Sequence, residues 1–194
     1  MKKSTRLFRT GSMVLGVIAI VGMIFISCSK DTTAPSPSGH NLKATECLEA
    51  TYTLWGGQTI DAGILTVWND ETTLYIDYTI TATNLPMTEI HLWAGKDISL
   101  CPHNTPGNPK PGLFPYFANA TSSTPAGYPY LTDPMHYALT IPLTDIEAVC
   151  DDIVYIAAHA ATPTETLWGE GTGFPGNNWA TYSTYSICCL DAQK

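Results

Sequence analysis

From residue 51 onward, the apolar residues follow the two-residue period of a β-strand and not the 3.6-residue period of a helix. One alternating run covers 60–64 and the next covers 74–80. The dipeptide Asn69-Asp70 between them favours a turn. These features predict a β-hairpin, and they restrict the chain to folds in which strands bury one face.

Five further segments have the composition of strands, since they are rich in Thr, Tyr, Val, Ile and Trp and are bounded by Gly, Pro or Asn. They cover 88–94, 135–143, 152–161, 165–168 and 178–188. No window has a convincing helical period. About seven to eight strands without helical crossovers predict an all-β fold, namely an antiparallel β-sandwich of Greek-key or jelly-roll topology; a β-barrel is the alternative.

One connection, residues 95–134, is rich in proline and glycine and exceeds the roughly 15 residues beyond which loops tend to be functional or disordered. It contains aromatic residues that a disordered segment rarely holds, namely Phe114, Tyr116, Phe117, Tyr128 and Tyr130. We therefore expect an ordered flap that lies over one face or one end of the fold.

The first 27 residues have the order of an export signal, which is a basic start, an apolar stretch and the small residue Ser27. The apolar stretch, 13–26, is shorter than the about 20 residues that a membrane-spanning helix needs. The tetrad Phe25-Ile26-Ser27-Cys28 resembles the lipobox of bacterial lipoproteins, with Phe in the place of the usual Leu. This resemblance implies that residues 1–27 are a removable signal peptide and that Cys28 becomes the acylated N-terminus, which anchors the protein in a membrane.

The resemblance also implies a destination. Ser29 follows the cysteine where Asp would favour the inner membrane, so we expect the outer membrane of a bacterial cell envelope, on its periplasmic or its outer side. Residues 28–39 are rich in Pro, Ser and Thr, which predicts a flexible linker after the lipidated cysteine. Residues 40–194 are then a single β-domain.

The charge of the chain excludes one class of partner. There are 9 Lys and Arg against 17 Asp and Glu, and the first 27 residues hold four of the basic residues and no acidic one. The remainder, with 5 basic and 17 acidic residues, has a net charge of −12. Such a surface repels phosphate backbones, so nucleic-acid binding is not expected.

Six cysteines in an exported protein indicate disulfides. With the acylated cysteine set aside, five remain, which predicts two bonds and one free thiol. Cys188 and Cys189 are adjacent, and neighbouring residues of a strand point to opposite faces, so each is expected to bond elsewhere. We expect Cys47 to pair with Cys188 or Cys189, and Cys101 to pair with Cys150.

Two of the predicted strands carry histidines. Alternation places Glu89 and His91 on one face of 88–94, and His159 lies in 152–161. If these strands are neighbours and the faces align, the three side chains supply ligands for a zinc ion with an open position. The alternative is that each histidine is a hydrogen-bonded structural residue. Calcium is a further candidate ion, for the oxygen ligands of Asp151-Asp152.

The segment 167–179 is rich in glycine and also holds aromatic, amide and carboxylate side chains. We expect a tight loop with exposed aromatic faces, on which the apolar side of a sugar ring stacks while polar groups bind its hydroxyls. The candidate ligand-binding residues are Trp168, Glu170, Asn177, Asn178 and Trp179. The alternative is that the aromatic residues fill the core.

Several short motifs, among them His91-Leu-Trp-Ala-Gly95, Ile156-Ala-Ala-His-Ala160 and Gly176-Asn-Asn-Trp-Ala-Thr-Tyr182, resemble a recurrent extracellular module of bacterial surface proteins. The resemblance implies an exported β-rich domain and transfers no catalytic residue. We therefore expect a lipid-anchored envelope protein whose domain binds a glycan or another envelope protein. The alternatives are a metal-dependent hydrolase that uses the Glu89, His91 and His159 face, and a structural or adhesion component without a small-molecule site.

Overall fold

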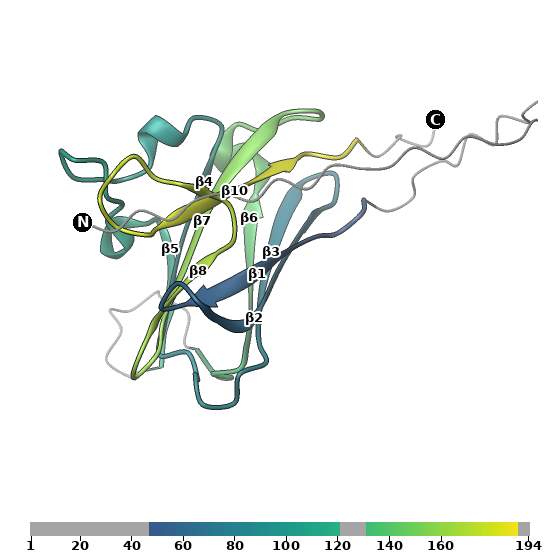
Figure 1. The fold of residues 1–194 in the computed structure, drawn as a ribbon. Coiled ribbons are helices and arrows are strands. Elements are labelled where there is room, and N and C mark those ends of the chain that lie inside the picture. The colour runs from purple at the N-terminus through teal and green to yellow at the C-terminus, as the bar shows by residue number, and fades with distance from the viewer. Residues whose placement is uncertain (1–46, 121–130, 190–194) are drawn as a thin grey trace, which may run out of the picture. The chain divides into compact units, whose positions relative to one another are not determined.

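The computed structural model describes residues 47–120 and 131–189, all of which belong to one compact unit, Leu42–Lys194. These residues form ten strands and three short 3₁₀-helices (Figure 1). Within them, no helix has the length and the apolar character needed to cross a membrane.

The strands are β1 (Ala50–Gly56), β2 (Ile60–Asn69), β3 (Thr73–Ile80), β4 (Glu89–Gly95), β5 (Tyr116–Asn119), β6 (His136–Pro142), β7 (Ile153–Ala161), β8 (Thr166–Gly169), β9 (Thr172–Gly173) and β10 (Thr181–Ser186). The 3₁₀-helices are η1 (Ile98–Leu100), η2 (Pro111–Leu113) and η3 (Leu143–Ile146). Antiparallel pairing joins the strands in the order β5-β4-β7-β8-β1-β2-β3-β6, and β10 pairs with β7 and β9. The predicted all-β, antiparallel fold is confirmed.

The predicted hairpin is the pair β2–β3, which runs in register from Gly63 opposite Ile80 to Asn69 opposite Leu74. Each of the five further predicted segments also contains a strand, namely β4, β6, β7, β8 or β10. The sequence did not predict β1, β5 or β9. Because β5 has four residues, it is too short to establish a period, and it lies inside the segment 95–134 that was expected to be a loop.

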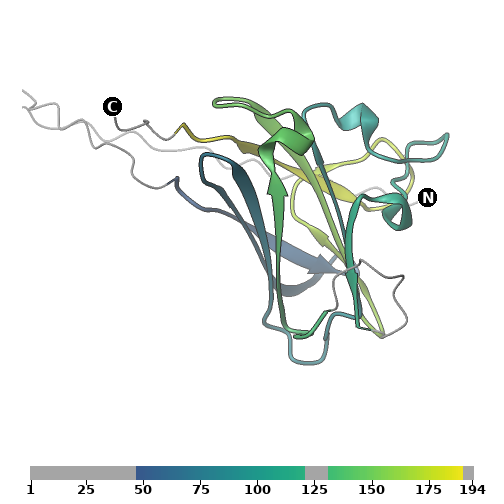
Figure 2. The same ribbon diagram turned by 180° about the vertical axis from the view of Figure 1, so that it is seen from behind.

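The sheet curls around the main core into a nearly closed, barrel-like shape (Figures 1 and 2). Leu131 N, just before β6, donates to Asn119 O at the end of β5, so the two ends of the strand order meet. Because the strands belong to one continuous sheet, the arrangement is closer to the barrel alternative than to two separate layers. The side chains that fill the core include Leu54, Leu65, Leu74, Ile76, Tyr78, Ile90, Leu92, Ile141, Ile156 and Leu167.

A second apolar cluster, here called the outer cluster, lies on the other face of β4, β7 and β8. It contains Trp93, Cys101, Phe114, Ala157, Trp168, Phe174 and Ala180. The loop residues of this cluster come from 96–115 and 170–180, so these two loops pack on the outer face of β4, β7 and β8. The expected ordered flap is thereby confirmed for the described part of 95–134, whereas Tyr128 and Tyr130 lie outside the described residues.

Two disulfides lie at the end of the domain where the described chain begins and ends. The Cα atoms of Cys47 and Cys188 are 5.6 Å apart, and those of Cys150 and Cys189 are 4.9 Å apart. The first bond is one of the two predicted alternatives, but the predicted Cys101–Cys150 bond is wrong. Cys101 is a buried free thiol in the outer cluster, and the pairing of β7 with β10 brings the chain after β10 next to Cys150 instead.

Candidate functional site

One transverse row of the sheet carries the predicted histidines. Cross-strand register places Phe117 opposite His91, His91 opposite His159, and His159 opposite Trp168. Trp168 is in turn opposite Trp55, so the row crosses β5, β4, β7, β8 and β1. Because partners in an antiparallel pair project from the same face, these five side chains share the outer face of the sheet.

The structure brings His91 and His159 together. Their ring centroids are 5.7 Å apart, with the ring planes at 44°. His91 Nε2 lies 3.2 Å from Glu89 Oε2, on the same face of β4. The condition set by the sequence, neighbouring strands with aligned faces, is met because β4 and β7 pair directly.

His159 is the more enclosed of the two histidines. It is 8% exposed, and its ring meets the Trp168 ring edge to face at a centroid distance of 4.8 Å. Burial, and to a smaller extent His91, lowers the pKa of His159 to about 3, so its imidazole is neutral at physiological pH. His159 Nδ1 is buried and has no hydrogen-bond partner within the described residues. Such an atom is rare in native proteins and calls for a water or an ion.

The predicted zinc site lacks a compact third ligand. Within residues 47–120 and 131–189, the group of three His, Cys, Asp or Glu whose ligand atoms lie within 4.8 Å of one another is Cys150, Asp151 and Cys189. Those two cysteines are bonded to each other in a disulfide, so neither offers a thiolate ligand. Glu89 therefore acts as the hydrogen-bond partner of His91 in this arrangement.

The candidate calcium ligands at Asp151-Asp152 are also engaged by the protein. Asp152 Oδ2 accepts a hydrogen bond from Val149 N at 2.9 Å and lies 3.3 Å from Lys96 Nζ. The backbone hydrogen bond, followed by the ammonium group, lowers the pKa of Asp152. Because the ammonium group competes with any cation for the same oxygen, the geometry does not favour calcium here.

The rings of the predicted aromatic loop are buried or half-buried. Trp168 is 5% exposed, and Trp179 is half-buried against the outer cluster. Asn177 and Asn178 are exposed, but Asn178 N donates to Asn108 Oδ1 at 2.9 Å. The expectation of exposed aromatic faces is therefore wrong for Trp168, because its ring packs against those of His159 and Phe174.

Glu170, the remaining predicted ligand residue, belongs to a groove on the outer face of β1 and β2. This β1–β2 groove has a volume of about 340 Å³. It is lined by Thr51, Tyr52, Thr53, Asp61, Gly63, Ile64 and Glu170. Glu170 Oε2 accepts a hydrogen bond from Thr53 N at 3.2 Å, which fixes the carboxylate at the rim. Trp55 is opposite Asp61, so the transverse row of rings ends beside this groove.

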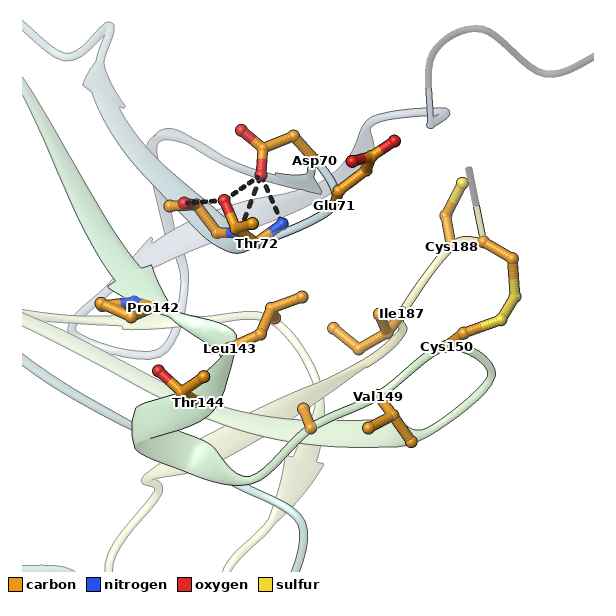
Figure 3. A pocket seen from close by; sticks show the side chains of 13 residues that line it. Asp70, Glu71, Thr72, Pro142, Leu143, Thr144, Val149, Cys150, Ile187 and Cys188 are labelled. Atoms are coloured by element: carbon orange, nitrogen blue, oxygen red, sulfur yellow. Dashed lines mark hydrogen bonds between the residues drawn. A yellow bond between two sulfur atoms is a disulfide. The ribbon is translucent and has the colours of Figure 1, made fainter. Parts of the chain in front are cut away.

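A larger pocket, of about 510 Å³, lies at the disulfide end of the domain (Figure 3). Leu143 and Ile187 are buried in its floor, and Asp70 and Glu71 lie at its edge. Asp70 Oδ1 already accepts hydrogen bonds from the backbone N–H groups of Thr72 and of the next residue, each at 2.8 Å. Since its best-placed polar group closes the β2–β3 turn, this pocket is the weaker candidate for a ligand.

Comparisons with known proteins do not assign the chain, because no family model, no curated protein and no solved structure matches it. The β1–β2 groove was not predicted from the sequence, because β1 was not predicted as a strand. The available signal was the alternation of Thr51, Thr53 and Trp55.

Proposed function

We propose that this chain is a lipid-anchored protein of a bacterial cell envelope whose β-domain binds a neutral glycan in the β1–β2 groove. The composition of the groove carries the proposal. Hydroxyl groups of Thr51 and Thr53 and carboxylates of Asp61 and Glu170 line it, without a Lys or Arg, and Trp55 lies beside it, opposite Asp61. Hydroxyls and carboxylates bind sugar hydroxyls, and an aromatic ring such as that of Trp55 packs against the apolar side of a sugar.

The polarity of the groove also defines the class of sugar. Asp61 and Glu170 are both exposed, and the remainder of the chain after residue 27 is strongly acidic. Two carboxylates that line one groove repel an acidic sugar. A neutral oligosaccharide is therefore the ligand that fits best.

Two features support the envelope location. The order of residues 1–28 resembles that of a lipoprotein signal, and the described residues contain two disulfides, which persist in oxidising compartments.

We expect Cys28→Ser to move the protein from the membrane fraction to the soluble extracytoplasmic fraction, measured by immunoblotting of cell fractions. Retention of this variant in the membrane at the level of the wild type would contradict the lipid anchor.

The glycan proposal is tested by measuring the binding of the full-length chain to an array of neutral and acidic oligosaccharides. We expect binding to neutral sugars, with affinity about tenfold lower in Asp61→Ala and in Glu170→Gln because each loses a polar contact of about 1.4 kcal/mol. Asp145→Ala, an exposed acidic residue of η3, is the matched control and is expected to bind as the wild type does.

Asn177→Ala distinguishes the groove from the loop at 167–179. Loss of binding in Asn177→Ala with retention in Asp61→Ala would place the sugar on the loop and overturn the groove. Absence of binding to every sugar would overturn the glycan proposal and favour the structural or adhesion alternative.

A further inference from the structure

The His91 and His159 pair is not used by the proposed glycan groove. We propose that these two histidines form a binding site for a divalent first-row transition-metal ion, with Glu89 orienting His91. The inference does not rest on the proposed function, since the pair lies on β4 and β7 and the groove lies on β1 and β2.

The separation of the rings fits a shared ion. Two imidazoles that bind one ion at about 2.0–2.1 Å place their ring centres about 5–6 Å apart. The observed centroid distance of 5.7 Å lies in this range. Since His91 and His159 are direct partners in the β4–β7 register, the sheet holds their backbones at this spacing.

The hydrogen bonding around the pair has the pattern of a metal site. A histidine that binds a metal through one ring nitrogen commonly donates from the other to a carboxylate, which fixes the ring orientation. His91 Nε2 lies 3.2 Å from Glu89 Oε2, which leaves Nδ1 for an ion. On the other side, His159 Nδ1 is buried without a partner. One ion accounts for both observations.

Two aromatic rings flank the histidine pair, and the His91 side is open to solvent. Phe117 flanks His91 at a centroid distance of 6.1 Å, and Trp168 flanks His159 at 4.8 Å, so the histidines lie between two aromatic rings. The side chain of His91 is 15% exposed and that of Glu89 is 52% exposed, so water can complete the coordination from the outside.

The ligand type defines the ion. Neutral imidazoles bind zinc, copper and nickel, and among divalent ions of this row the affinity of a nitrogen site is highest for copper. Cu²⁺ also accepts a coordination sphere in which two protein nitrogens are supplemented by water. The expected order of affinity is therefore Cu²⁺ above Zn²⁺, with one ion per chain.

The test is titration of the full-length chain, with its disulfides formed, with Cu²⁺ alone. We expect one equivalent to bind, an electron paramagnetic resonance spectrum with two imidazole nitrogens, and quenching of tryptophan fluorescence because Trp168 contacts His159. His91→Ala is expected to weaken binding about 100-fold and to leave one nitrogen in the spectrum, and Glu89→Gln is expected to weaken it about tenfold.

His136→Ala is the matched control. His136 Nε2 also contacts a carboxylate, at 2.7 Å from Asp77 Oδ2, but its cross-strand partner is Thr79 and not a second histidine. This variant is expected to bind Cu²⁺ as the wild type does. Equal affinity of the wild type and His91→Ala would overturn the proposal, and so would absence of binding to the wild type, which would leave a water molecule as the partner of His159.

Discussion

Asn69, at the end of β2, is a buried polar residue that joins two distant parts of the chain. Its Oδ1 accepts hydrogen bonds from Tyr185 Oη at 2.8 Å and from Cys188 N at 3.0 Å, and its Nδ2 donates to Cys188 O at 3.2 Å. An amide can do this because it has a donor and an acceptor on one planar group. At the residue scale, the side chain thus connects the hairpin β2–β3 to the chain beyond β10.

The next residue, Asp70, closes the hairpin turn. Hydrogen bonds from Tyr75 Oη, at 2.7 Å, and from the backbone of Thr72 lower the pKa of Asp70 below its usual value of 3.8. The ionised carboxylate therefore stabilises the folded state above pH 3.8, and this contribution is lost as the pH falls through the folded pKa.

We predict that Asp70→Asn lowers the free energy of unfolding at pH 7 by about 1 kcal/mol, because the hydrogen bonds lose their charged acceptor. The difference from the wild type is expected to persist down to about pH 4 and to shrink below it. Urea denaturation of both proteins at several pH values measures it. A difference that stays constant below pH 3 would contradict the role of the charge.

At the element scale, the loops 102–110 and 174–180 pack against each other over the outer face of the sheet. Asn108 Oδ1 accepts a hydrogen bond from Asn178 N at 2.9 Å, and a side chain at Gly176 would collide with Asn108. Gly107 has a φ of +93°, a conformation that favours glycine, and its Cα faces Pro175. This close packing joins the two loops that contribute Phe114 and Phe174 to the outer cluster, which also contains Trp168.

We predict that Asn108→Ala loosens the loop 174–180 while the sheet keeps its structure. The backbone N–H of Asn178 loses its acceptor, so its hydrogen exchange should become faster, and the cost in global stability should be about 1 kcal/mol. Hydrogen exchange followed by mass spectrometry measures the first effect. Asn177→Ala, at the exposed residue before Asn178, is the control. Equal rates of hydrogen exchange at Asn178 N in the two variants would show that Asn108 does not hold the loop.

At the scale of the whole molecule, both disulfides lie at the end of the domain where the described chain begins and ends. Cys47–Cys188 joins residues 141 positions apart, and Cys150–Cys189 joins residues 39 positions apart. In the chain-entropy model, the longer loop gives the larger restriction of the unfolded state. The first bond therefore stabilises the domain more, at about 5 kcal/mol against about 4 kcal/mol.

We predict that the double variant Cys47→Ala/Cys188→Ala is less stable than Cys150→Ala/Cys189→Ala by about 1 kcal/mol in urea denaturation.

Peptide mapping under non-reducing conditions should recover the two bonds. Burial raises the pKa of the Cys101 thiol to about 12, so alkylation of Cys101 should require unfolding. A Cys101–Cys150 peptide, or rapid alkylation of the native protein, would contradict the structure.

The sequence predicted local features that depend on neighbouring residues. The period of two identified β2 and β3, and it placed Glu89 and His91 on one face. It did not identify β5, because four residues carry too little pattern. The β1–β2 groove was not predicted because β1 was not identified as a strand, and a groove between two strands also depends on their register.

The class of fold follows from the sequence alone, because alternation within each strand requires one buried face whatever the strand pairs with. Which strands are neighbours depends on the tertiary structure, which places His159 opposite His91 and Cys189 beside Cys150. The burial of Trp168 also follows from the tertiary structure, because alternation tells which face a side chain is on but not whether other segments, here those with His159 and Phe174, cover that face. Long-range packing sets these three outcomes, and it is not encoded in the period of any one segment.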